Sequence, residues 1–160
     1  MKILACLLLI ISFALPNLVE VRKQYTSASE TASKSELFAE LLSPIAKSDS
    51  KTLVAYKGAS TALKAKYARS KELKKSSFVE GVALLEYALK SEPNNVEIRL
   101  IRLSIQENTP KIMNYKKNLA EDKAFIIHNF STQTPALQAY VRTYVKRSEV
   151  FSAEEKALLR

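Results

Sequence analysis

Basic side chains are concentrated in one stretch of the chain, which is its strongest candidate for a binding site. Seven lysine and arginine residues lie between positions 57 and 75, where Glu72 is the single acidic residue. The seven are Lys57, Lys64, Lys66, Arg69, Lys71, Lys74 and Lys75. Positive side chains attract anionic groups through forces that salt screens. We therefore predict a surface for an anionic partner here; the alternative is a lysine-rich solvated surface that only promotes solubility.

Nucleophilic catalysis would have to use His128, the one histidine in the sequence. A Ser-His-Asp relay would join it to Asp49 or Asp122, the only aspartates. The sequence has no G-x-S-x-G pattern, which exposes a nucleophilic serine between a strand and a helix. We therefore expect His128 to lie partly exposed near a helix end, without a catalytic role.

The sequence also offers few residues for metal binding or for catalysis by paired carboxylates. Outside the N-terminal segment the chain has one histidine and no cysteine, whereas zinc takes three or four such ligands. Glu121–Asp122 and Glu154–Glu155 are adjacent carboxylates, but neighbours on a helix point about 100° apart. We expect no metal, no cofactor and no enzymatic activity. The alternative is a hydrolase or carbohydrate-active enzyme in which carboxylates from distant helices lie about 5 to 10 Å apart in a groove.

The composition favours a helical protein with a basic surface. Of the 160 residues, 47% are hydrophobic and 26% are charged, and glycine occurs only twice. Scarce glycine with abundant alanine, leucine, lysine and glutamate is typical of helices. The formal net charge of +9 favours anionic partners such as lipopolysaccharide, acidic polysaccharide, acidic proteins or nucleic acid. The net charge indicates the sign of the partner's charge and not the partner's identity.

The N-terminal segment has the pattern of a secretory signal. Lys2 precedes an apolar run over residues 3–11, and the small residues at positions 12 and 14 suit signal peptidase. We predict a signal peptide over residues 1–14 with cleavage near Ala14, a secreted or periplasmic location, and one helical domain over residues 15–160. The run is shorter than the about 20 residues of a membrane span, so an uncleaved anchor is the weaker alternative. Lipid attachment at Cys6 is disfavoured because the apolar run continues after this residue.

Helix-start signals recur along the chain. A capping side chain stands three residues before a glutamate at Asn17, Ser33, Ser77 and Ser152. Two further starts are the pairs Thr109–Pro110 and Thr134–Pro135. The predicted helices span residues 17–30, 34–47, 51–69, 77–91, 95–107, 110–129, 135–147 and 152–159. The sixth is expected to break between residues 114 and 118, so the fold class is all-α with about seven to eight helices.

The stretch "EPNNVEIRLIRLSIQEN" has apolar residues on two sides of a helix. One side carries Val96, Leu100 and Leu103. The opposite side carries Ile98, Ile101 and Ile105, with Glu97, Arg99, Arg102 and Ser104 in the flanks. We expect such a helix to lie between two layers. A strand is the competing interpretation of "VEIRL", but the alternation stops after it and no partner strand is evident.

The helix predicted at residues 51–69 is expected to be central. A stripe of small residues, Ala55, Ala59 and Ala62, runs beside a bulky stripe of Tyr56, Leu63 and Tyr67. Small side chains let a neighbouring backbone approach, so another helix should pack closely on this one.

Part of the chain resembles a tetratricopeptide repeat (TPR). The small residue, bulky residue, alanine and closing proline of its second helix correspond to Gly81, Leu85, Ala88 and Pro93, and Tyr56 and Gly58 resemble the aromatic residue and glycine of its first helix. Gly58 and Pro93 are 35 residues apart instead of the about 24 of the repeat pattern, so the match is to a degenerate repeat over roughly residues 51–107. This resemblance implies antiparallel helical hairpins in right-handed stacking.

The chain after the signal also resembles a group of uncharacterised small secreted helical proteins of Bacteroidota. The similar stretches are "LVEVRKQY", "TLVAYKGAS", "EPNNVEIRLIRLSIQEN" and "EDKAFII". This likeness implies the fold and the location, and it supplies no active site. Our hypothesis is a non-enzymatic interaction or scaffold protein whose partner is a protein or an anionic envelope component. Nucleic acid would become a candidate partner only if the N-terminal segment were not a signal.

Overall fold

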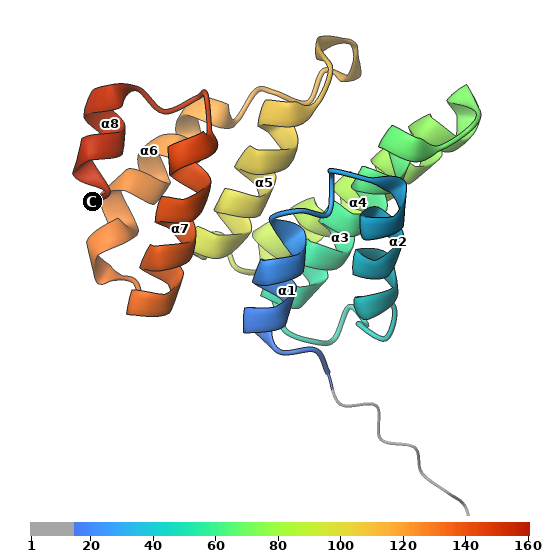
Figure 1. Cartoon of the computed structure of the whole chain (residues 1–160), viewed down its shortest axis with the longest axis horizontal. Helices are drawn as coiled ribbons and strands as arrows, with labels where there is room; N and C mark the ends of the chain where they lie inside the picture. The colour runs from blue at the N-terminus through green and yellow to red at the C-terminus, as the bar shows by residue number, and fades with distance from the viewer. Residues whose placement is uncertain (1–14) are drawn as a thin grey trace, which may run out of the picture.

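The computed structural model describes residues 15–160, and all regular secondary structure in that range is helical (Figure 1). The predicted all-α fold is therefore confirmed for these residues. The elements are α1 (Leu18–Tyr25), α2 (Ala32–Leu41), α3 (Lys51–Tyr67), α4 (Lys71–Ser91), α5 (Val96–Asn108), η1 (Lys111–Met113), α6 (Leu119–Asn129), η2 (Phe130–Thr132), α7 (Pro135–Arg147) and α8 (Ala153–Leu158). None of these helices is both long enough and apolar enough to cross a membrane. The predicted signal peptide, its cleavage site and Cys6 lie outside the described residues.

Three of the predicted helix starts are confirmed by their hydrogen bonds. The side chain of Asn17 accepts the N–H of the residue three positions on, at 2.9 Å. Thr134 does the same at 3.3 Å, and Pro135 occupies the first turn of α7. Ser152 and Glu155 cap each other's backbone N–H groups in a full capping box. These contacts satisfy N–H groups that have no partner inside the helix.

The predicted starts of two other helices are wrong. α2 begins after Thr31, whose Oγ1 accepts the N–H of Lys34 at 3.1 Å, and not after Ser33. α4 begins after Ser70, so Ser77 lies in its interior. The residues between these two serines include Lys, Glu and Leu, which are strong helix formers and extend the helix toward its N-terminus. α1 and α2 also end before their predicted boundaries.

The segment between α5 and α6 departs most from its predicted structure. Thr109 ends α5, and its Oγ1 donates to the carbonyl of Ile105 at 2.6 Å, so it does not cap a following α-helix. The chain continues through η1 and turns at Asn114, which has a φ of 48°. α6 then begins at Leu119. The predicted break between residues 114 and 118 is confirmed, but the α-helix predicted before it is wrong.

α3 occupies a central position, as predicted, and meets α4 backbone to backbone. A Cβ atom on Gly81 would lie 2.3 Å from the amide nitrogen of Ala62, and one on Gly58 would lie 2.7 Å from the carbonyl oxygen of Gly81. Ala55 and Ala59 are fully buried. α3 also contacts α1, α2 and α5. The stripe of small residues therefore acts as expected, by letting a neighbouring helix approach closely.

α5 lies between two groups of helices, α1 to α4 and α6 to α8 (Figure 1). In the apolar cluster shared with α1 to α4, its residues are Ile98, Ile101 and Ile105. In the cluster shared with α6, α7 and the residues that flank α8, its residues are Val96, Leu100 and Leu103. The two apolar sides predicted for this helix are therefore two packing interfaces.

Candidate functional site

Within residues 15–160, the structure divides the predicted basic site into two lysines that bond to backbone carbonyls and five residues that do not. The Lys57 ammonium group donates to the carbonyl oxygens of Ser43, at 3.0 Å, and Ile45, at 2.5 Å. The Lys66 ammonium group donates to the carbonyl of Ser29 at 2.7 Å. Lys66 thereby attaches α3 to the connection before α2, and Lys57 attaches it to the connection after α2. Backbone carbonyls without helical partners need such donors. We therefore remove both from the candidate binding surface.

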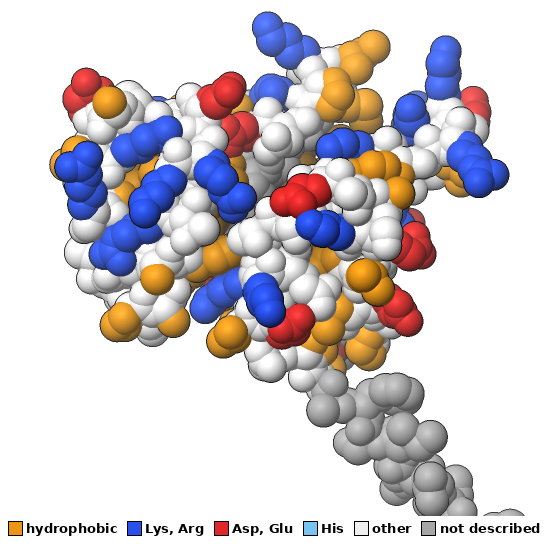
Figure 2. Space-filling view, in the orientation of Figure 1, with side chains coloured by type: hydrophobic (Ala, Val, Ile, Leu, Met, Phe, Trp, Pro, Cys, Tyr) orange, Lys and Arg blue, Asp and Glu red, His pale blue; other side chains and the backbone are white. Residues whose placement is uncertain are grey.

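The remaining five basic residues are exposed. They are Lys64, Arg69, Lys71, Lys74 and Lys75. Within residues 15–160 none of the five makes an ion pair. They lie where α3 ends and α4 begins, and this end of the helix pair projects from the rest of the molecule with basic side chains on it (Figures 1 and 2). We call these five residues the distal basic surface.

An apolar groove lies beside the distal basic surface and was not predicted. It has a volume of about 780 Å³ and runs between the first half of α4 and the segment that carries η1. Lys71, Lys74 and Lys75 line it together with apolar side chains of α4, Ile112 and Met113. The rings of Phe78 and Tyr115 also line it, edge to face with centroids 5.8 Å apart. A site that combines apolar walls with a few charged groups is typical of small-molecule binding.

The groove follows from the unequal lengths of neighbouring helices. α4 has 21 residues and α5 has 13, and residues 92–95 connect them, so the first turns of α4 extend beyond α5. At a rise of about 1.5 Å per residue the excess is roughly 12 Å. Tyr115 fixes the opposite wall, because its hydroxyl donates to the Glu86 carboxylate of α4. Burial and this carboxylate raise the pKa of Tyr115.

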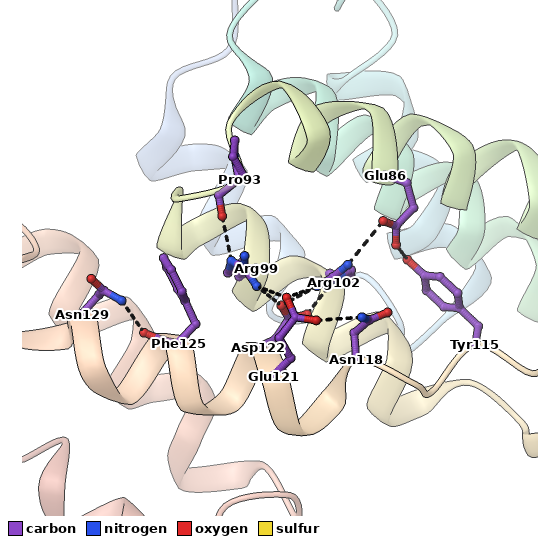
Figure 3. A network of polar contacts seen from close by, with 10 residues as sticks. All are labelled: Glu86, Pro93, Arg99, Arg102, Tyr115, Asn118, Glu121, Asp122, Phe125 and Asn129. Carbon is purple, nitrogen blue, oxygen red and sulfur yellow. Dashed lines mark hydrogen bonds and ion pairs between the residues drawn. The ribbon is translucent and has the colours of Figure 1, made fainter.

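The second concentration of charge is a buried network between α5 and α6 (Figure 3). Arg102 binds the fully buried Asp122 through two hydrogen bonds, of 2.6 and 2.7 Å. Arg99 bridges the neighbouring carboxylates, at 3.0 Å from Asp122 and 2.8 Å from Glu121. Burial lowers the pKa of Arg102, but the hydrogen bonds to Asp122 and the attraction of the Asp122, Glu86 and Glu121 carboxylates together outweigh it and leave the pKa above its ordinary value. The hydrogen bond from Arg99 lowers the pKa of Glu121.

This network joins α5 to α6, and arginines pair with both of its adjacent carboxylates. Arg99 and Arg102 each hold the carboxylate of Asp122 in a charge-assisted contact, so it is not directed at a cavity. The lining of the groove between α4 and η1 includes no carboxylate, and that of the 390 Å³ cavity beside α1 and α2 includes only Glu40. A glycoside hydrolase would need two carboxyl groups facing one cleft.

A third polar cluster ties the first helices to α5. Arg22 of α1 contacts Glu97 at 2.6 and 2.8 Å, and the Tyr56 hydroxyl donates to the same carboxylate at 2.8 Å. Tyr25 and Ser104 share a hydrogen bond of 2.6 Å. Burial raises the pKa of Tyr25 to about 12. The sequence placed Glu97 and Ser104 on the flanks of their helix, and the structure buries both.

His128 lies exposed in the last turn of α6, as expected from the sequence. The aspartates considered for a catalytic relay are engaged elsewhere, since Asp122 pairs with arginines and Asp49 accepts the N–H of Ala46 at 2.7 Å. Over residues 15–160, no three His, Cys, Asp or Glu side chains gather in a way that could hold a metal ion.

Comparison of the chain with protein-family models, with curated proteins and with solved structures finds no significant match. No relative therefore assigns an activity or a binding residue to this fold. The distal basic surface and its groove are the features from which a function can be argued.

Proposed function

We propose that this protein is a non-enzymatic interaction protein that binds an anionic partner through the distal basic surface. One observation carries this function: five exposed basic side chains, unpaired within residues 15–160, stand together beside an apolar groove. Clustered charge of one sign repels itself and attracts counter-charged partners. The arginines of α5 show the other use of charge in this chain, because Arg99 and Arg102 are matched by carboxylates.

The fold and location are part of the same proposal. We propose that the helices form antiparallel, TPR-like hairpins and that the protein acts in the periplasm or outside the cell. The backbone contact of Gly58 with Gly81 and the packing of α5 on α6 support the hairpin arrangement. The signal-like pattern of residues 1–14 supports the location. A protein or an anionic component of the envelope is the expected partner.

A matched pair of charge-reversal variants tests the proposed surface. The first carries Lys71→Glu, Lys74→Glu and Lys75→Glu. The control carries Lys23→Glu, Lys90→Glu and Lys146→Glu, which are also exposed and lower the net charge equally. Affinity for two soluble polyanions, polyglutamate and a sulfated polysaccharide, is measured at increasing salt concentration.

We expect the distal variant to lose most of its affinity and the control variant to lose much less. Affinity of the unaltered protein should fall as salt is added, because salt screens attraction between exposed charges. Equal losses in both variants would show that net charge alone drives binding, and the proposed surface would then be wrong. Circular dichroism verifies that both variants remain folded.

A further inference from the structure

Two segments project from the same edge of the molecule and form the two sides of the groove (Figures 1 and 2). One is the end of the α3–α4 pair, and the other is the segment 110–118 that carries η1. Both expose large apolar side chains. Ile112 of η1 is 91% exposed, and Val79 of α4 is 55% exposed. Apolar side chains therefore face solvent on both sides of the groove, as they do at interaction surfaces.

The second projecting segment is basic like the first. Residues 110–118 contain three lysines and no acidic residue. Lys116 donates to the carbonyl of Glu107 at 2.8 Å, whereas Lys111 and Lys117 are exposed. Positive charge therefore lies on both sides of the groove. A partner that neutralises both sides must present negative charge over an area and not at a single point.

We propose that this edge of the molecule binds the surface of a membrane rich in anionic phospholipid. Ile112 lies at a projecting tip beside Lys111, so the apolar side chain can enter the acyl region while the ammonium group stays at the level of the phosphates. Lys71, Lys74 and Lys75 reach the phosphates from the other side of the groove. This inference rests on the proposed function, because it names the anionic partner of the same surface.

Charge complementarity sets the size of the expected effect. A basic residue near an anionic membrane surface contributes about five-fold in affinity, and added salt reduces this contribution. Reversing the charge of Lys71, Lys74 and Lys75 should therefore weaken binding to anionic vesicles by about 100-fold or more. Vesicles of phosphatidylcholine, which carry no net charge, should bind weakly from the start.

The absence of tryptophan from the sequence allows a direct test of which surface meets the lipid. Ile112→Trp introduces a single fluorescent reporter at the proposed contact. Leu158→Trp introduces the same reporter on α8, where the native side chain is 68% exposed. The full chain of each variant is mixed with vesicles of phosphatidylglycerol and phosphatidylcholine or of phosphatidylcholine alone, with and without lipids brominated on their acyl chains.

We expect the Ile112→Trp emission to shift to the blue on anionic vesicles and to be quenched by brominated lipid. The Leu158→Trp emission should change much less. Adding Lys71→Glu, Lys74→Glu and Lys75→Glu to the Ile112→Trp variant should abolish the shift. Equal quenching of the two reporters, or a shift that the lysine changes leave intact, would overturn the membrane contact at this edge.

The soluble polyanions distinguish failure of this inference from failure of the proposed function. Suppose that substituting the distal lysines weakens binding to polyglutamate or the sulfated polysaccharide, while anionic vesicles leave the Ile112→Trp emission unchanged. The surface then binds anions but not membranes. The lipid inference would then be wrong, and a soluble acidic partner would take its place. If substituting these lysines changes binding neither to the polyanions nor to anionic vesicles, both proposals fail.

Discussion

The charges of α5 and those of the distal basic surface are used in opposite ways. Arg102 of α5 is buried and bonded to a buried aspartate, whereas Lys71, Lys74 and Lys75 are exposed and make no ion pair within residues 15–160. A buried charge must be matched, since leaving it without a partner costs several kcal/mol. An exposed lysine keeps its hydration and carries no such requirement. The difference separates charges that hold this fold from charges that are free to bind.

Lys57 shows that position in the sequence does not decide between these two uses. It belongs to the same basic run as Lys71, yet it donates to two backbone carbonyls before α3. Lys64, two turns further along the same helix, is exposed. Four substitution experiments, from the largest expected effect to the smallest, test whether burial and pairing separate the two groups.

Removing the buried carboxylate should have the largest effect. Asp122→Ala removes the closest partner of the buried Arg102 and leaves only its longer contacts with Glu86 and Glu121, and we expect the free energy of unfolding to fall by about 3 to 5 kcal/mol. Urea denaturation followed by circular dichroism measures the change. Glu121→Ala is the matched control, because this carboxylate is exposed on the same helix and should cost less than about 1 kcal/mol. Similar losses in the two variants would remove the distinction between buried and exposed pairs.

Lys57→Met should have an intermediate effect. The substitution keeps an unbranched apolar stem but removes the donor to the carbonyls of Ser43 and Ile45. A hydrogen bond from a charged donor is typically worth more than a neutral one, and we expect a loss of about 1 to 2 kcal/mol in unfolding free energy. Lys64→Met, measured in the same way, should stay within about 0.5 kcal/mol of the unaltered protein. If the two variants have the same unfolding free energy, the hydrogen bonds of Lys57 do not stabilise the fold.

A smaller, pH-dependent effect is expected at α8. The hydrogen bond from Lys123 and the backbone N–H of Ser152 lower the pKa of Glu155. Its folded pKa therefore lies below the unfolded value of about 4.3. This group contributes stability above about pH 4.3, and the contribution disappears as pH falls through the folded pKa.

The size of this contribution should be below about 1 kcal/mol, because the pair is partly exposed and screened by solvent. Glu155→Gln should make the unfolding free energy less dependent on pH between about pH 6 and pH 3. Lys123→Met should remove the part of the effect that the two side chains share, so combining the two changes should cost less than their sum. Strict additivity would argue that the pair does not interact.

Neutralising the exposed lysines should have the smallest effect on stability. Lys71→Gln, Lys74→Gln and Lys75→Gln remove three charges from one helix end, and each should change the unfolding free energy by no more than about 0.5 kcal/mol. Relief of mutual repulsion even favours a slight gain. A large loss on thermal denaturation would show that these side chains support the fold.

Local patterns in the sequence predicted the helices and the packing of α5 well. The spacing of Ile98, Ile101 and Ile105 against Val96, Leu100 and Leu103 placed two interfaces on one helix, and the structure confirms both. This succeeds because helical periodicity fixes which residues share a face. Helix starts were less predictable, since Ser70 and Ser77 are both acceptable caps and only the stability of the extra turns selects the first.

The candidate site was only partly predictable. The sequence identified the distal basic surface but added Lys57 and Lys66, whose carbonyl acceptors lie in other segments and cannot be recognised from local spacing. The groove depends on how far α4 extends beyond α5 and on the path of residues 110–118, which are tertiary properties. Arg99 and Arg102, three residues apart, did offer a signal: they share a helix face that could meet the adjacent carboxylates Glu121 and Asp122.

The position of α5 between two apolar clusters has a consequence for how the molecule comes apart. Neither α1 to α4 nor α6 to α8 can lose its packing without exposing one side of α5 to water. The two halves should therefore unfold in a single cooperative transition instead of as separate units. In native-state hydrogen exchange, the slowest amides should be those of α5, and their protection should report the global free energy of unfolding.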